Sequence, residues 1–166
     1  MRNPIGIKCG PTLTAEELVQ LLERLDPERE AGRITLITRY GADGVESVLP
    51  AHIRAVQAAG HPVVWASDPM HGNTVSTSSG LKTRNFDRIL AELRAVFAVH
   101  EAEGSRLGGV HFELTGANVT ECTGGPEQLL EQDLVSAYET FCDPRLNYGQ
   151  SLEMAFLIAQ RLQRRG

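Results

Sequence analysis

The 166-residue sequence has few cysteines, no long apolar run and no excess of positive charge. Its three cysteines, Cys9, Cys122 and Cys142, are an odd number without a CxxC pair, which disfavours a disulfide framework and a zinc ribbon and predicts reduced thiols. The longest apolar stretches have the length of a strand, far short of the roughly 20 residues that span a bilayer. The start of the chain lacks an apolar signal region. We therefore expect a cytoplasmic protein without a membrane partner.

The charge balance disfavours nucleic acid as a partner. Sixteen Lys and Arg residues stand against 21 Asp and Glu residues, and the basic residues are scattered rather than gathered into a stripe. This distribution disfavours binding to nucleic acid. With 42% hydrophobic and 22% charged residues, the composition is typical of a globular chain and excludes disorder, collagen and coiled coil. Because the chain has no linker, low-complexity run or close repeat, we expect one domain.

Short apolar segments alternate with helical periodicity along the chain. The predicted strands are 5–9, 34–38, 62–67 and 109–114, and the predicted helices are approximately 15–25, 49–59, 86–97, 126–141 and 150–165. A capping box of Thr14 and Glu17 opens the first helix. A loop rich in Ser and Thr is expected before Arg84. Strands followed by helices through short connections predict an α/β fold with a parallel sheet and helices packed outside it.

Polar side chains stand at the carboxyl ends of all four predicted strands. They are Lys8, Arg39, His71 and Glu113. In parallel α/β sheets this end is where ligands bind, because the strand-to-helix loops and the helix N-termini converge there. A single such residue is often solvated or structural, but four at successive strand ends favour a shared site.

These residues, with the loop carboxylate of Asp143, divide into an anion pocket and a metal site. Lys8 and Arg39 would form the anion pocket. His71, Glu113 and Asp143 provide an imidazole and two carboxylates, which suit a divalent cation of the Mn, Co, Fe or Zn kind. Competing candidates for the metal site are Asp68, His111 and Glu121.

Two further assignments leave alternatives open. His111 and Glu113 share a face of the predicted strand by its period of two, and we prefer Glu113 as the ligand because it is nearer the strand end. Lys82 and Arg84 precede the helix that starts near residue 86, so two cations and a helix N-terminus could form a second phosphate site. The alternative for this segment is a solvated loop.

Seven segments carry a family resemblance in the right order over nearly the whole chain. They are 3–11 (NPIGIKCGP), 32–39 (GRITLITR), 68–74 (DPMHGNT), 82–84 (KTR), 113–116 (ELTG), 119–122 (VTEC) and 142–147 (CDPRLN). Together they resemble the class II (plant-type) 3-deoxy-D-arabino-heptulosonate 7-phosphate (DAHP) synthases. Members of this family are metal-dependent TIM-barrel transferases that join phosphoenolpyruvate to erythrose 4-phosphate, at the entry to the shikimate pathway and aromatic amino acid biosynthesis.

The resemblance implies a role for each predicted site residue. Lys8 and Arg39 match residues that hold phosphoenolpyruvate, and with His71 they are the expected catalytic residues. Lys82 matches a residue near the sugar phosphate, and Arg84 is expected to bind substrate beside it. His71, Glu113 and Asp143 match three of the four metal ligands, and Mn²⁺ or Co²⁺ is the expected ion.

The chain resembles only the carboxyl-terminal part of the family's enzymes. The fourth metal ligand, a cysteine, belongs to the other part, together with further substrate-binding arginines. Cys9 is not expected to replace that cysteine, because it is adjacent to Lys8 in a strand and so points to the opposite face. The expected fold is a partial TIM barrel of four C-terminal βα units plus a C-terminal helix, forming a single half-barrel domain over residues 1–166.

Three functional hypotheses are compatible with the sequence. The first is a DAHP synthase whose barrel is completed by a complementary N-terminal half-barrel chain or by a homo-oligomer, because a half-barrel leaves two open sheet edges and a bare apolar inner face. The alternative is a non-catalytic truncated barrel fragment or assembly partner. A third is an unrelated metal-dependent aldolase built as a homodimeric double half-barrel.

Overall fold

The computed structural model describes residues 3–163. These residues form two compact units. Unit 1 comprises the residues up to Gly72 together with 91–111, and unit 2 comprises 73–90 together with the residues from 112 onwards. The single half-barrel domain over 1–166 stays a prediction.

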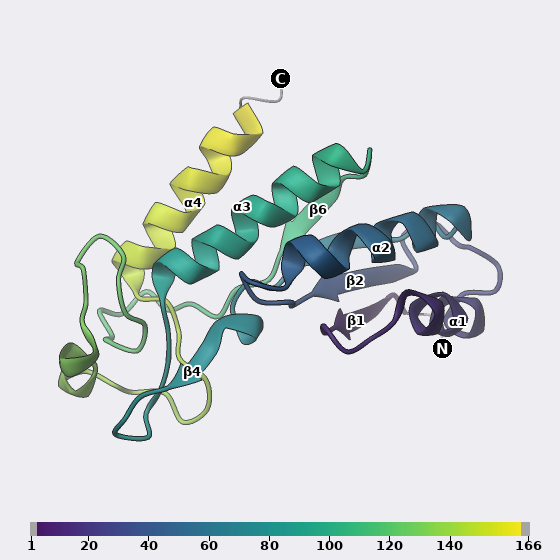
Figure 1. The fold of residues 1–166 in the computed structure, drawn as a ribbon. Coiled ribbons are helices and arrows are strands. Elements are labelled where there is room, and N and C mark those ends of the chain that lie inside the picture. Colours follow the sequence, from purple (N-terminus) through teal and green to yellow (C-terminus); the bar gives the residue numbers. More distant parts are fainter. Residues whose placement is uncertain (1–2, 164–166) are drawn as a thin grey trace. The chain divides into compact units, whose positions relative to one another are not determined.

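Unit 1 is built on a parallel sheet of four strands in the order β1-β2-β3-β6. The strands are β1 (Ile5–Cys9), β2 (Ile34–Thr38), β3 (Val64–Ser67) and β6 (Leu107–Val110). Figure 1 labels strands β1, β2 and β6 of this sheet and the helices that follow β1 and β2 in the chain. The α/β class and the parallel sheet are thus confirmed. Strand β3 begins two residues later than predicted, and Pro62, which has no N–H to donate to the ladder, lies outside it.

The fourth predicted strand, 109–114, is wrong in both of its bounds. Strand β6 starts at Leu107 and ends at Val110, so Glu113 lies beyond the strand. The two glycines of LGGV weaken the strand pattern in the sequence. Gly108 allows close packing against Val64, because an added Cβ at this position would lie only 3.2 Å from Cγ1 of Val64. Consequently, His111 and Glu113 do not share a strand face.

Unit 1 contains α1 (Ala15–Leu25), α2 (Val45–Ala58) and, from residue 91 onwards, α3 (Phe86–Ala102). The predicted capping box of α1 is present, since Thr14 Oγ1 accepts from the Glu17 N–H and Glu17 accepts from the Thr14 N–H. The predicted start of α2 at residue 49 is wrong by four residues. The turn after β2 lets the Val45 N–H donate to the Gly41 carbonyl, so the helix begins there and Pro50 lies inside it.

One face of the sheet is covered and the other is open. Alternate residues such as Leu36 and Trp65 are buried with the helix residues, whereas Lys8 and Val64 lie on the exposed face. Val64 is 39% exposed. The alternation of period two therefore places the apolar core on the helix side of the sheet.

A buried histidine joins the loops that follow β1 and β2. His52 Nε2 donates to the Leu13 carbonyl oxygen at 2.9 Å, and the Tyr40 hydroxyl donates to His52 Nδ1 at 2.6 Å. A carbonyl can only accept, so these contacts assign the neutral tautomer with the proton on Nε2. Burial lowers the pKa of His52, although its hydrogen bond to Leu13 acts in the opposite direction.

This histidine predicts a specific pH dependence of stability. Below an unfolded-state pKa of about 6.5, the unfolded imidazole gains a proton that the buried one resists. The free energy of unfolding is therefore expected to fall as the pH decreases from about 7.5 towards about 5. Urea denaturation of His52→Gln, which keeps a neutral donor for Leu13, should show a shallower pH dependence than the unaltered chain. Equal slopes for the two proteins would contradict the assignment.

Unit 2 differs most from the predicted secondary structure. The segment expected as a Ser/Thr-rich loop forms an antiparallel hairpin of β4 (Thr74–Ser76) and β5 (Lys82–Arg84). The predicted helix 126–141 is wrong, because within it only η2 (Glu131–Ser136) forms, as a 3₁₀ helix. Gly124, Gly125 and Gln128 all have positive φ angles, of 76°, 78° and 52°, and these prevent a regular helical entry.

The last helix, α4 (Tyr148–Gln163), begins two residues before its predicted start, and its predicted end lies outside the described residues. A further short 3₁₀ helix, η1 (His71–Asn73), follows β3. Within residues 3–163, none of the helices combines the length and the apolar character that a membrane-spanning segment requires.

Candidate functional site

In unit 1, the carboxylate of Asp68 organises the carboxyl end of the sheet. Asp68 directly follows β3 and has no exposed side-chain surface. Its Oδ2 accepts from Lys8 Nζ and lies next to His71 Nδ1, at 2.7 Å in both cases. Its Oδ1 accepts the backbone N–H groups of Met70 and His71, each at 3.1 Å. Lys8 and His71, two of the predicted site residues, are thereby brought together.

The charge state of Asp68 follows from these contacts. Burial alone would raise the pKa of Asp68, but hydrogen bonds from Lys8 and His71 outweigh it and hold the pKa below its usual value. Asp68 is therefore an ionised partner of both residues. Sequence reasoning predicted Asp68 only as a possible metal ligand and missed this organising role. The Asp-Pro-Met-His spacing directly after a strand is the signal that could have identified it.

Lys8 and Arg39 line one pocket beside α1, with a volume of about 640 Å³. Arg39 is fixed at the end of β2 because its N–H donates to the Cys9 carbonyl at 3.0 Å. Its guanidinium lies over Gly10, where an added Cβ would be 3.5 Å from Arg39 Nη2. Arg24 of α1 contributes a third cation to the lining, which sequence reasoning missed. One glutamate of α1 also lines the pocket, so three cations stand against one carboxylate and the pocket suits an anion.

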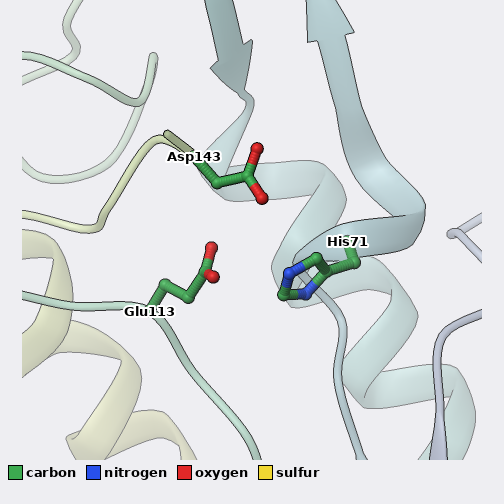
Figure 2. Close-up of side chains that lie close together, drawn as sticks. All are labelled: His71, Glu113 and Asp143. Carbon is green, nitrogen blue, oxygen red and sulfur yellow. The ribbon is translucent and has the colours of Figure 1, made fainter. Parts of the chain in front are cut away.

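In unit 2, two predicted metal ligands lie around the buried guanidinium of Arg84. Arg84 Nη1 donates to Glu113 Oε2 at 2.5 Å, and Arg84 Nη2 lies 4.0 Å from Asp143 Oδ2. Lys82 Nζ donates to Asp143 Oδ1 at 3.1 Å. Glu113 and Asp143 each offer a carboxylate oxygen, and these two atoms lie within 4.8 Å of each other. Figure 2 shows the two carboxylates, together with the imidazole of His71.

The backbone explains how Glu113 reaches Asp143 without lying in a strand. The Leu146 N–H donates to the Glu113 carbonyl at 3.0 Å, and Leu114 forms an isolated parallel bridge with Leu146. These contacts hold Glu113 against the 142–147 loop, which carries Asp143. The two partners are far apart in the sequence, so no local pattern could reveal the pairing.

The remaining competing ligands have other contacts. Glu121 is buried and accepts from Arg145 through its backbone N–H, Nε and Nη2 at 2.8, 3.0 and 2.6 Å. Burial would raise the pKa of Glu121, but the hydrogen bonds from Arg145 outweigh it and lower the pKa. Glu121 therefore anchors the 142–147 loop. His111 is exposed, and its ring centre lies 6.3 Å from that of His71.

The cysteines fall into two classes. Burial raises the pKa of Cys9 to about 11 and that of Cys122 to about 12, whereas Cys142 is exposed. Cys9 is buried while Lys8 lies on the opposite, exposed face of β1, as the strand period predicts. The Cys9 thiol is therefore protonated at neutral pH, which disfavours it as a metal ligand.

This difference in exposure predicts a simple labelling pattern. Iodoacetamide at neutral pH is expected to add one carbamidomethyl group to the native chain, at Cys142, and three groups after denaturation. Mass spectrometry of the intact chain and of its peptides measures both results. Labelling of Cys9 in the native chain would contradict its burial.

The predicted ligand set fits a divalent ion by its chemistry. His71, Glu113 and Asp143 offer one imidazole and two carboxylate atoms, and this donor set is compatible with a divalent metal ion.

Comparison with known proteins identifies the family. Residues 1–159 match the Class-II DAHP synthetase family. The chain is 56% identical over 161 residues to the phospho-2-dehydro-3-deoxyheptonate aldolase AroG of Mycolicibacterium smegmatis. It is 55% identical over 160 residues to the phospho-2-dehydro-3-deoxyheptonate aldolase of Streptomyces coelicolor. It is also 55% identical over 159 residues to the enzyme of the same name from Neurospora crassa. These matches cover 97%, 96% and 95% of this chain but 35%, 36% and 33% of the relatives, so the chain spans about a third of their length. The chain belongs to the class-II DAHP synthetase family, as its motifs predict.

Proposed function

We propose that this chain supplies phosphoenolpyruvate-binding and metal-binding residues to a 3-deoxy-7-phosphoheptulonate synthase. This transferase condenses phosphoenolpyruvate with erythrose 4-phosphate in the first step of the shikimate pathway. The observation that carries the proposal is the cluster of Lys8, Asp68 and His71 at the carboxyl end of a parallel sheet. The family membership and the names of the relatives support it.

The pocket lined by Lys8 and Arg39 is the proposed site for phosphoenolpyruvate. This substrate carries a phosphate and a carboxylate, and the two cations match its two anionic groups. Held by Asp68, the Lys8 ammonium is fixed in direction, which reduces the entropy lost on binding. Lys8 and Arg39 would also offset the charge that changes as C3 of phosphoenolpyruvate attacks the aldehyde, before water adds at C2 and phosphate leaves.

The proposed metal ligands are His71, Glu113 and Asp143. The Nδ1–H of His71 faces the carboxylate of Asp68 at 2.7 Å, so Nε2 is the ring atom that would hold the ion. Asp68 thereby fixes both the tautomer and the direction of the imidazole. When bound, a divalent ion such as Mn²⁺ or Co²⁺ supplies Lewis-acid polarisation of the substrate aldehyde. Lys82, which is half-exposed, is the proposed contact for the sugar phosphate.

The proposed assembly is a partial TIM barrel completed by another polypeptide. Four parallel strands are half of the eight that close such a barrel. Strands β1 and β6 are the two edges of the sheet, and the apolar side chain of Val64 lies on its exposed face. A complementary chain corresponding to the other two thirds of the relatives is the proposed partner, and a second copy of this chain is the alternative. A non-catalytic assembly role is the function that remains if no such partner restores turnover.

Binding of phosphoenolpyruvate tests the proposed pocket directly. Isothermal titration calorimetry is expected to show that Arg39→Gln weakens binding about tenfold or more, because a charge-assisted contact to the anion is lost. Arg94→Gln is the matched control, since Arg94 is an exposed cation of α3 outside the pocket lining, and its loss changes the net charge equally. Equal affinities of the Arg39 and Arg94 variants, or no binding by the unaltered chain, would contradict the proposed function.

A further inference from the structure

The guanidinium of Arg84 is a fully buried charge in unit 2. Its side chain has no exposed surface, and it forms hydrogen bonds with partners from three different segments. Nε donates to Thr74 Oγ1 at 2.8 Å across the β4–β5 hairpin. Nη1 donates to Glu113 Oε2 and to the Pro144 carbonyl, both at 2.5 Å. These contacts fix the position of the guanidinium plane.

One nitrogen of this group has no acceptor. Arg84 Nη2 is buried and makes no hydrogen bond to any described residue. A buried N–H group without an acceptor costs about 1–3 kcal/mol, and more when the group is charged. The Asp143 carboxylate lies 4.0 Å from Nη2, just beyond hydrogen-bond distance. A small rotation of Asp143 would satisfy this nitrogen.

We propose that Arg84 is a positioning residue that holds Glu113 through Nη1 and Asp143 through Nη2, so that the two carboxylates present their other oxygens to one divalent ion. The inference rests on the metal site of the proposed function. It differs from the sequence-based expectation that Arg84 binds substrate. A side chain without exposed surface, with Nε and Nη1 already donating, is poorly placed to meet a phosphate group.

Lys82 and Arg84, the two cations of this cluster, then have different roles. Lys82 contacts Asp143 through its ammonium group and is 54% exposed, so it can move away at little cost. Arg84 is buried and fixed. A permanent cation beside two carboxylates lowers their mutual repulsion and keeps them in place before a metal ion binds.

Manganese binding by variants of the full chain tests the inference. Arg84→Lys keeps the charge but loses the planar fork, and it is expected to weaken Mn²⁺ binding about tenfold or more, measured by calorimetry and by the electron paramagnetic resonance signal of free Mn²⁺. Thr74→Val, which removes the acceptor of Nε but keeps Arg84 and both carboxylates, is expected to weaken Mn²⁺ binding less. Thr83→Val is its matched control, because Thr83 lies in the same hairpin and donates to the Glu121 carbonyl, away from both carboxylates.

The outcomes separate the possible roles of Arg84. Circular dichroism in metal-free buffer checks that each variant is folded, and if Arg84→Lys does not fold, Thr74→Val against Thr83→Val decides. Unchanged Mn²⁺ affinity with weaker binding of inorganic phosphate would overturn the inference in favour of a substrate contact, and leave the proposed function standing. Tighter Mn²⁺ binding by Arg84→Gln would overturn it in favour of simple charge repulsion. No Mn²⁺ binding by the unaltered chain would overturn both the inference and the proposed metal site.

Discussion

Replacing Asp68 by alanine is expected to lower the free energy of unfolding by about 3 kcal/mol. The carboxylate has no exposed surface and accepts from Lys8 Nζ, His71 Nδ1 and two backbone N–H groups. Its removal deletes four hydrogen bonds to one buried acceptor, and a hydrogen bond to a charged group contributes more than one between neutral groups. Urea denaturation in metal-free buffer, followed by circular dichroism, measures the effect.

Two comparisons make the Asp68 result specific. Asp68→Asn keeps an oxygen for the backbone N–H groups but loses the charge, so it is expected to cost less stability than Asp68→Ala. Glu16→Ala, at an exposed position in the first turn of α1, is the control for loss of a carboxylate and should change stability by less than about 1 kcal/mol. If Asp68→Ala unfolds at the same urea concentration as Glu16→Ala, the organising role of Asp68 is wrong.

Replacing His71 by alanine is expected to abolish metal-dependent turnover in the assembled enzyme and to weaken Mn²⁺ binding by about 100-fold. The reason is the loss of the only nitrogen donor among the proposed ligands. Stability should change little, because the imidazole is partly exposed and the Asp68 carboxylate keeps Lys8 and both backbone donors.

The neighbouring histidine provides the control for this substitution. His111 is exposed and its ring centre lies 6.3 Å from that of His71, so His111→Ala removes an imidazole from the same region. It should leave Mn²⁺ affinity close to that of the unaltered chain. A large drop in the melting temperature of His71→Ala in metal-free buffer, with Mn²⁺ affinity retained, would make His71 structural and refute its assignment as a ligand.

The parts of the fold that the sequence predicts correctly depend on local signals. Strands β1 and β2 have their predicted bounds, and the Thr14–Glu17 capping box forms, because short-range apolar periodicity and a side chain three residues away determine them. The helix expected over 126–141 does not form, and one reason is the positive φ of Gln128. The sequence does not reveal this conformation, because Gln128 is not a glycine. The β4–β5 hairpin is missed because its three-residue strands are too short to show a period.

For the candidate site too, the sequence predicts some features and not others. Lys8, Arg39 and His71, which the strand-end rule singles out, lie at one end of the unit 1 sheet, and their role stays a prediction. It is silent on the contacts of Arg84, whose burial depends on partners 29 and 60 positions away in the sequence. Contacts between residues so far apart produce no periodic pattern in the sequence. The contacts of a buried cation can therefore be seen only in the three-dimensional structure.

The measurement that tests the central claim most directly is turnover of phosphoenolpyruvate and erythrose 4-phosphate with added Mn²⁺, by this chain alone and after mixing with a complementary polypeptide. The complement is the part of the Mycolicibacterium smegmatis relative that this chain does not match, about two thirds of it. We expect no measurable phosphate release from either polypeptide alone, and Mn²⁺-dependent release from a one-to-one complex detected by analytical ultracentrifugation. A stable 18.1 kDa monomer that turns over both substrates by itself, or an inactive one-to-one complex, would contradict the proposed function.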